Sequence, residues 1–140
     1  MSRVGGVFLA LALLAGGCGT STAIADVTVG DCFDDPADVV VESLELIDCD
    51  RPHDNEVYAN LAIEQSIFPG DDVLEAFAVD ACLPALEAYA GVSYAESDLD
   101  YTFFVPTADT WNTTAERTVT CFLYAADLSK LSGSAKRSES

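Results

Sequence analysis

The stretch CDRPHDNEVYA, residues 49–59, decides how this chain folds. It begins with a cysteine and holds Arg51 and the one histidine of the chain, His53. Proline fixes its own φ and disfavours a helical conformation in the residue before it, so Arg51-Pro52 predicts a turn or a strand entry. Beyond it, an alternating pattern predicts a strand over residues 57–63. The stretch therefore predicts a cysteine-anchored corner that delivers a charged turn into a strand.

The rest of the chain supplies neighbours for that strand. Runs rich in β-branched and aromatic residues predict further strands at residues 27–33, 39–47, 101–106 and 117–124. In the last run, Val119, Cys121 and Leu123 point to one face, and the residues between them point to the other. Residues 109–112 suggest a short helical turn.

A longer helix is expected from Asp71 to the glycine at position 91. Acidic residues in the first turn suit the positive end of the helix dipole, and Gly91 suits a C-terminal cap. Pro84 predicts a kink or two abutting helices. The apolar face that recurs at spacings of three and four consists of Leu74, Ala78, Ala81, Cys82, Ala85 and Tyr89. This order of elements predicts an α+β fold: a small antiparallel sheet with one long or kinked helix packed on one face, braced by two disulfides.

The cysteine count supports the two disulfides. There are five cysteines, and lipidation of Cys18 would leave four: Cys32, Cys49, Cys82 and Cys121. In an oxidising compartment, four cysteines predict two bonds with three possible connectivities. We favour Cys32–Cys49 and Cys82–Cys121, because each joins elements that can lie side by side. A zinc site combining Cys49 with the histidine is the weaker alternative, since no CxxC pair exists, and no metal or other cofactor is expected.

Residues 1–17 are expected to be a lipoprotein signal peptide, with a base at Arg3 and an apolar run too short to span a membrane. The sequence LAGGC at 14–18 resembles a lipobox, in which the cysteine is diacylated. Residues 18–25 then form a tether, residues 26–128 the domain, and residues 129–140 a polar, frayed tail. The protein is expected on the outer face of the cell membrane, anchored through acylated Cys18. The alternative is secretion after cleavage at Ala25.

Acidic residues dominate the charge of the chain. Its formal net charge at pH 7 is −18, and residues 26–100 hold twenty acidic residues against one base, Arg51. Such a surface repels nucleic acid, so no nucleic-acid partner is expected. The apolar fraction of 50% is too high for a disordered chain, so the acids must coat a packed core. No calcium loop of the DxDxDG type is present, and the acidity is interpreted first as solubility.

Six residues are candidates for binding: Arg51, His53, Asp54, Glu56, Trp111 and Arg117. His53 is the one candidate general base of the usual kind, and Asp54 or Asp50 could fix its tautomer. No GxSxG elbow accompanies it and the cysteines are expected to be oxidised, so no catalytic residue is assigned and no enzyme is expected. The first interpretation is structural: Arg51 and His53 satisfy acceptors in the turn, and Arg117 partners a buried acid.

Several motifs follow one another along the chain: VGDCF at 29–33, CDRPHDNEV at 49–57, Cys82, Pro106-Thr107, Trp111, Arg117, Val119 and Cys121. In this order they resemble the bacterial septum formation domain family. The element Cys-x-x-Pro-His-Asp-x-Glu-Val is the specific part, and the resemblance covers nearly all of the chain after the signal segment. It implies a cell-envelope or division-associated role, as in lipoproteins and membrane-tethered proteins of Gram-positive bacteria. It implies no established reaction for any residue here.

These observations lead to one main hypothesis and two alternatives. The first is a non-enzymatic, lipid-anchored envelope domain that binds another envelope component, either a protein or a cell-wall partner. The second is a cell-wall-directed hydrolase that uses His53 and an adjacent acid. The third is a purely structural role, which a fully packed surface around residues 51–54 would favour.

Overall fold

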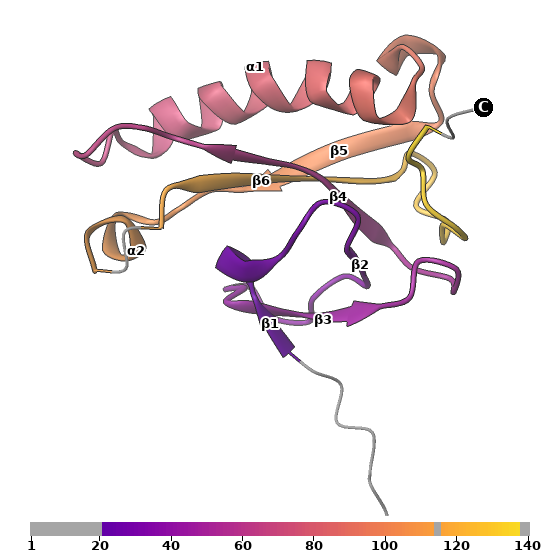
Figure 1. The fold of residues 1–140 in the computed structure, drawn as a ribbon, viewed down its shortest axis with the longest axis horizontal. Coiled ribbons are helices and arrows are strands. Elements are labelled where there is room, and N and C mark those ends of the chain that lie inside the picture. The colour runs from indigo at the N-terminus through magenta and orange to yellow at the C-terminus, as the bar shows by residue number, and fades with distance from the viewer. Residues whose placement is uncertain (1–20, 114–115, 138–140) are drawn as a thin grey trace, which may run out of the picture.

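The computed structural model describes residues 21–113 and 116–137, and the predicted signal segment with Cys18 lies outside them. A six-stranded antiparallel sheet carries one long helix on one face (Figure 1). The strands are β1 Ser21–Ala23, β2 Cys32–Phe33, β3 Ser43–Ile47, β4 Asn55–Ala62, β5 Leu99–Phe104 and β6 Thr118–Ala125, in the spatial order β1-β3-β2-β4-β6-β5. The helices are α1 Asp71–Ala90 and α2 Ala108–Thr113, with 3-10 turns at Ile24–Asp26 and Tyr94–Glu96. The predicted α+β fold is confirmed, and so are both disulfides. None of the helices in the described ranges combines the length and apolar character that a membrane crossing requires.

Helix α1 runs without interruption through Pro84, so the alternative of two abutting helices is wrong. Pro84 is exposed, and the carbonyl that loses its hydrogen bond therefore lies on the side where water can replace it. The helix ends at Gly91, as predicted, in a left-handed cap with φ 72°. Its buried residues are Leu74, Ala78, Cys82 and Leu86, a strict spacing of four. The sequence pattern predicted the first three and missed Leu86.

Strand β4 contains a bulge that changes which residues share a face. Its register with β6 shifts between Val57 and Ala59, which leaves Tyr58 as the extra residue. In a regular strand Val57 and Ala59 would point the same way. Here Tyr58 and Ala59 both pack toward α1, whereas Val57 packs in the opposite cluster with Phe122. The alternation expected from residue 57 therefore breaks after its first position.

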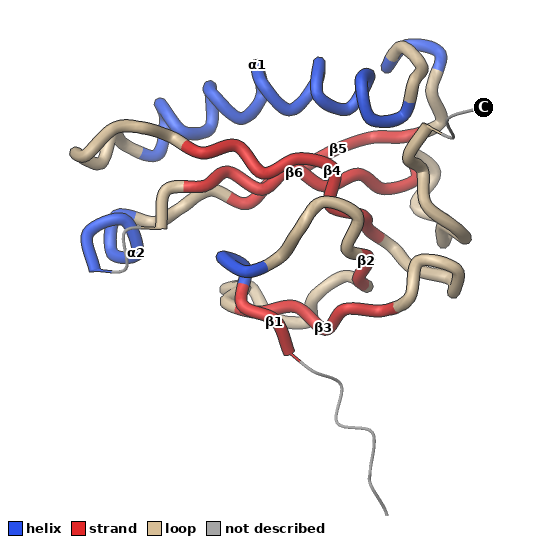
Figure 2. The backbone as a smooth tube through the Cα atoms, viewed as in Figure 1, coloured by secondary structure: helices blue, strands red, loops and turns tan. Residues whose placement is uncertain are grey.

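The sheet separates two hydrophobic clusters. The cluster under α1 contains Tyr58, Ala59, Ala78, Cys82, Leu86, Val119, Cys121 and Leu123. The disulfide Cys82–Cys121 crosses it, with the two Cα atoms 5.8 Å apart. The cluster on the other face contains Val27, Phe33, Leu44, Val57 and Phe122. Figure 2 shows β1, β2 and β3 on the side of β4 and β6 that faces away from α1.

The N-terminal third differs most from the prediction. Only Cys32–Phe33 of the predicted strand 27–33 is a strand, because Asp31 closes a turn on Thr28 and Gly30 adopts φ 97°. Strand β3 begins at Ser43; Val39 and Val40 before it are exposed, and Val41 packs against the second hydrophobic cluster. Ser21–Ala23, expected as part of a tether, pairs with β3.

The C-terminal segment, residues 126–137, packs against the corner and the end of α1. Leu131 exchanges two backbone hydrogen bonds with His53, of 2.9 and 2.8 Å. The Arg137 N–H donates to the Tyr89 carbonyl at 2.8 Å, and the Arg137 side chain lies so close to Gly91 that a β-carbon there would approach it to 2.7 Å. Up to Arg137, the segment therefore differs from the frayed tail that its polar composition led us to expect.

Candidate functional site

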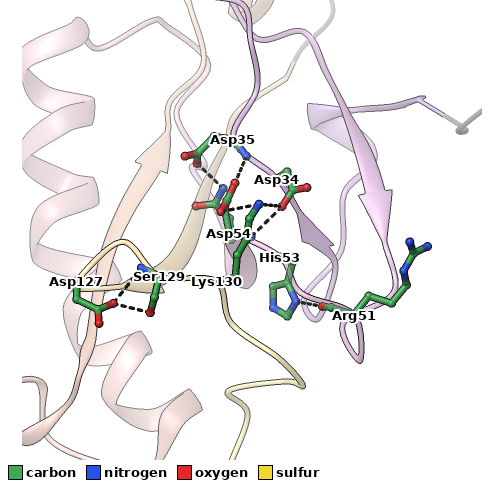
Figure 3. Close-up of polar contacts among 9 residues, drawn as sticks. Asp34, Asp35, Arg51, His53, Asp54, Asp127, Ser129 and Lys130 are labelled. Atoms are coloured by element: carbon green, nitrogen blue, oxygen red, sulfur yellow. Dashed lines mark hydrogen bonds and ion pairs between the residues drawn. The ribbon is translucent and has the colours of Figure 1, made fainter.

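The corner at residues 51–56 sends its side chains in different directions, and His53 goes inward (Figure 3). The His53 side chain is fully buried, and its Nδ1 lies 2.8 Å from the Arg51 carbonyl oxygen. Because a carbonyl only accepts, Nδ1 carries a proton and donates it to this oxygen. Nε2 has no hydrogen-bond partner among the described residues. The Arg51 side chain is exposed and extends away from the ring.

Glu56 is the second buried polar residue of the corner, on the α1 side of β4. Its carboxylate accepts hydrogen bonds from the Tyr89 hydroxyl and the Ser134 hydroxyl, each 2.5 Å, and from the Ala135 N–H at 2.8 Å. Burial, together with the Glu56 carboxylate, raises the pKa of Tyr89 to about 12. Glu56 therefore joins α1, β4 and the C-terminal segment, which is a structural task.

Cys32, His53 and Glu56 form the group of buried ligand atoms in the described chain that could hold a metal ion, with donor atoms within 4.8 Å of one another. The sulfur of Cys32 is bonded to that of Cys49, however, at 2.04 Å. Metals bind cysteine as the thiolate, which a disulfide does not provide. With the disulfide intact, Cys32 cannot supply a thiolate ligand, and only His53 and Glu56 of this group could bind a metal.

Asp54 points to the opposite side of the corner and does not orient the histidine. Its carboxylate accepts the Asp35 N–H at 2.9 Å and pairs with Lys130 Nζ at 2.9 Å. Lys130 also pairs with Asp34 at 2.7 Å, so one base bridges two acids (Figure 3). The hydrogen bond from the Asp35 N–H, helped by Lys130, lowers the pKa of Asp54.

Trp111 and Arg117 lie away from this corner, beyond the other end of β6. Trp111 is fully buried and donates its indole N–H to the Ser66 carbonyl at 3.3 Å. The Arg117 guanidinium lies 5.4 Å from the centre of the Trp111 ring, a cation–π contact. Within residues 21–113 and 116–137, no ion pair joins Arg117 to an acid. The predicted site residues therefore form two separate groups.

A groove of about 400 Å³ lies on the face of the sheet opposite α1. Its floor is aromatic: Phe104, Phe122 and Tyr124, with the rings of Phe104 and Phe122 4.7 Å apart. Its walls are formed by Asp35, Pro36, Asp54, Asn55, Thr102, Ala125, Leu128 and Ser129. A concave apolar surface with a few polar groups is the usual form of a ligand site. Of the residues singled out from the sequence, only Asp54 lines it.

Leu128, on the rim of this groove, has an unusual backbone. Its φ is 63°, the only positive φ outside glycine in the described chain. A residue with a β-carbon is disfavoured in this region by roughly 1–2 kcal/mol. The leucine side chain is 79% exposed, so internal packing does not offset that cost. Strain of this kind gathers at functional sites, and Leu128 is therefore a candidate ligand contact.

The far wall of the groove belongs to β5, the last strand of the sheet. The Tyr101 N–H donates to the side chain of the preceding residue, Asp100, at 2.8 Å, and the Leu99 N–H donates to the Ser97 hydroxyl at 2.9 Å. The Tyr94 hydroxyl donates to the same Asp100 oxygen, at 2.9 Å, and this bond raises the pKa of Tyr94. The backbone N–H groups of Leu99 and Tyr101 therefore donate to side chains and not to a further strand.

Sequence reasoning missed most of the groove. The alternation over residues 117–124 did place Phe122 and Tyr124 on the face away from the helix, and two aromatic side chains there were the available signal. The strained backbone of Leu128 leaves no such trace, because leucine gives no hint of a positive φ.

Comparison with known proteins finds one family. A family model described as septum formation matches residues 29–139, which span the corner, α1, the groove and the C-terminal segment. No curated protein and no solved structure matches the chain.

Proposed function

Because this chain belongs to the septum formation family, whose name supports a cell-division role at the envelope, we propose that it is a non-enzymatic binding domain anchored to the outer face of the cell membrane. In this proposal the groove on the open face of the sheet takes another envelope component. The lipid on Cys18 keeps the domain at the membrane, and the two disulfides hold it folded there.

The observation that carries the proposal is the strained, exposed leucine on the rim of an aromatic groove. The groove has a floor of three aromatic rings, and Leu128 stands over it at 79% exposure. A residue with a β-carbon is disfavoured at φ 63°, and the exposed leucine side chain gains no internal packing that would offset this cost. A leucine there is understandable if its side chain contacts a ligand.

The arrangement of His53 argues against the alternative of a cell-wall hydrolase. A general base must reach the proton that it removes. The His53 ring is fully buried behind Leu131, and its Nδ1 faces a carbonyl instead of a carboxylate. We therefore assign His53 a structural role.

The test replaces Leu128 by glycine in cells that depend on the protein for division. Leu128→Gly removes the side chain and relieves the backbone, so the protein stays folded while groove binding weakens. Ile67→Gly is the matched control, because Ile67 is 80% exposed and lies outside the groove. The proposal expects defective septa with Leu128→Gly and normal septa with Ile67→Gly. Normal septa with both variants would overturn it.

The anchor has its own test. Mass spectrometry of the mature protein from cells, without reduction, is expected to give a chain that begins at residue 18 and carries acyl groups. A chain that begins at residue 26 would mean secretion instead.

A further inference from the structure

We propose that the ligand of the groove is an extended peptide with a basic residue, which pairs with the outer edge of β5 and lays alternate apolar side chains on the aromatic floor. This inference rests on the proposed function, which requires only that the groove binds something. It adds that the occupant is a peptide with a basic residue and that this peptide lies along β5.

The outer edge of β5 supplies the backbone contacts. In the described chain β5 pairs with β6 on one side only. The N–H groups of Leu99 and Tyr101 are held by the side chains of Ser97 and Asp100, so both point to the outer edge. By the two-residue period of a strand, the N–H of Phe103 points there too. An extended peptide could pair with this row, as in other cases of strand addition, if its carbonyls replace the Ser97 and Asp100 side chains as acceptors for Leu99 and Tyr101.

The hollowed surface is longer than one small ligand needs. A second hollow of about 350 Å³ lies next to the 400 Å³ groove, and Phe104 lines both. The second hollow is bordered by Val39 and Val40, which are 102% and 75% exposed. An apolar surface that follows the strand direction suits alternate side chains of an extended chain.

The charges around the groove select a basic occupant. Lys130, the base beside the groove, is already paired with Asp34 and Asp54. Asp35 and Asp100 have no ion pair with a described base, and each accepts only neutral donors in the contacts found. A lysine or arginine of the peptide would complement them. A second copy of this chain would bring like charges together, at a formal charge of −18 for each copy.

The experiment is selection from a displayed library of random ten-residue peptides on the purified full-length protein. The inference expects enriched peptides with lysine or arginine beside alternating apolar residues. A synthetic copy of an enriched peptide should bind about tenfold more weakly to Asp100→Asn, which keeps an acceptor for the Tyr101 N–H and removes the charge. Glu64→Gln removes an exposed acid outside the groove and should bind the peptide as the wild type does.

A second measurement tests the strand pairing. N-methylation of alternate peptide amides should abolish binding in one register and spare it in the other, because only one set of amides faces β5. No enrichment, enriched peptides without bases, equal binding to Asp100→Asn, or tolerance of N-methylation in both registers would each overturn the inference. If it fails while Leu128→Gly still impairs septa, the groove binds something other than a peptide and the proposed function stands. If Leu128→Gly has no effect in cells either, both the peptide inference and the proposed function are wrong.

Discussion

The two sides of the corner at residues 53–56 differ in how accessible they are to solvent. On one side, His53 and Glu56 are fully buried under the C-terminal segment, and Glu56 accepts three hydrogen bonds. On the other side, Asp54 and Asn55 line an open groove. The side that holds His53, the one candidate general base in the sequence, is closed to solvent and has a structural role. The rest of the open groove is formed by residues from β5, β6 and the chain after β6, together with Asp35 and Pro36.

On the closed side, we expect Glu56 to contribute most to stability. Glu56→Ala leaves three donors facing a cavity, and each hydrogen bond to a charged group contributes about 1.5–3 kcal/mol. We expect the free energy of unfolding to fall by at least about 3 kcal/mol. Hydrogen exchange should quicken at residues 131–137. A loss below about 1 kcal/mol would mean that the corner is not held by this carboxylate.

A milder change on the same closed side is Tyr89→Phe. It removes one hydrogen bond to Glu56 and should lower the free energy of unfolding by about 2 kcal/mol at neutral pH. Because the folded-state pKa of Tyr89 is raised to about 12, its contribution is complete below about pH 10 and is lost as the pH rises toward 12. Denaturant unfolding at several pH values should therefore show a flatter alkaline limb for Tyr89→Phe. An unchanged limb would contradict this.

On the open side, the same kind of measurement should give the opposite sign. Leu128→Gly relieves a left-handed backbone and should raise the free energy of unfolding by up to about 1 kcal/mol. Ile67→Gly should lower it by about 0.5–1 kcal/mol, because glycine gains entropy in the unfolded chain. Thermal unfolding of the two variants side by side checks this. A destabilised Leu128→Gly would show that the leucine serves packing.

The smallest expected effect is at Asp54, on the rim between the two sides. Its pKa is lowered in the folded protein, so its contribution is present above the ordinary value of about 3.9 and is lost as the pH falls below it. Asp54→Asn should therefore unfold with a shallower dependence on pH below about 5. The stability of the two proteins should converge at the lowest pH, and parallel curves would contradict the assignment.

The sequence predicted what depends on local pattern and on cysteine chemistry. Gly91 ends α1 as expected, and Cys82 and Cys121 meet because each lies on an apolar face with the expected period. The bulge at Tyr58 was not predictable, since it depends on the register with β6. Nor was the docking of the C-terminal segment, because Ser134 and Ala135 carry no signal that they would meet Glu56.

The same limit explains the candidate site. The sequence drew attention to rare residues, the one histidine and the isolated arginine, but the fold buries the histidine in the corner and uses only the backbone carbonyl of Arg51 there. The groove is made from common residues that become distinctive only in three dimensions. Leu128 by its backbone and Asp100 by its place on the last strand of the sheet are examples.

The proposed function requires that the open side is occupied in the cell. Site-specific photo-crosslinking tests this, with a photoreactive amino acid at position 128 or, as control, at position 67. We expect a discrete adduct with another polypeptide from position 128, lost on Asp100→Lys, and none of it from position 67. No adduct from position 128, or the same adducts from both positions, would contradict it.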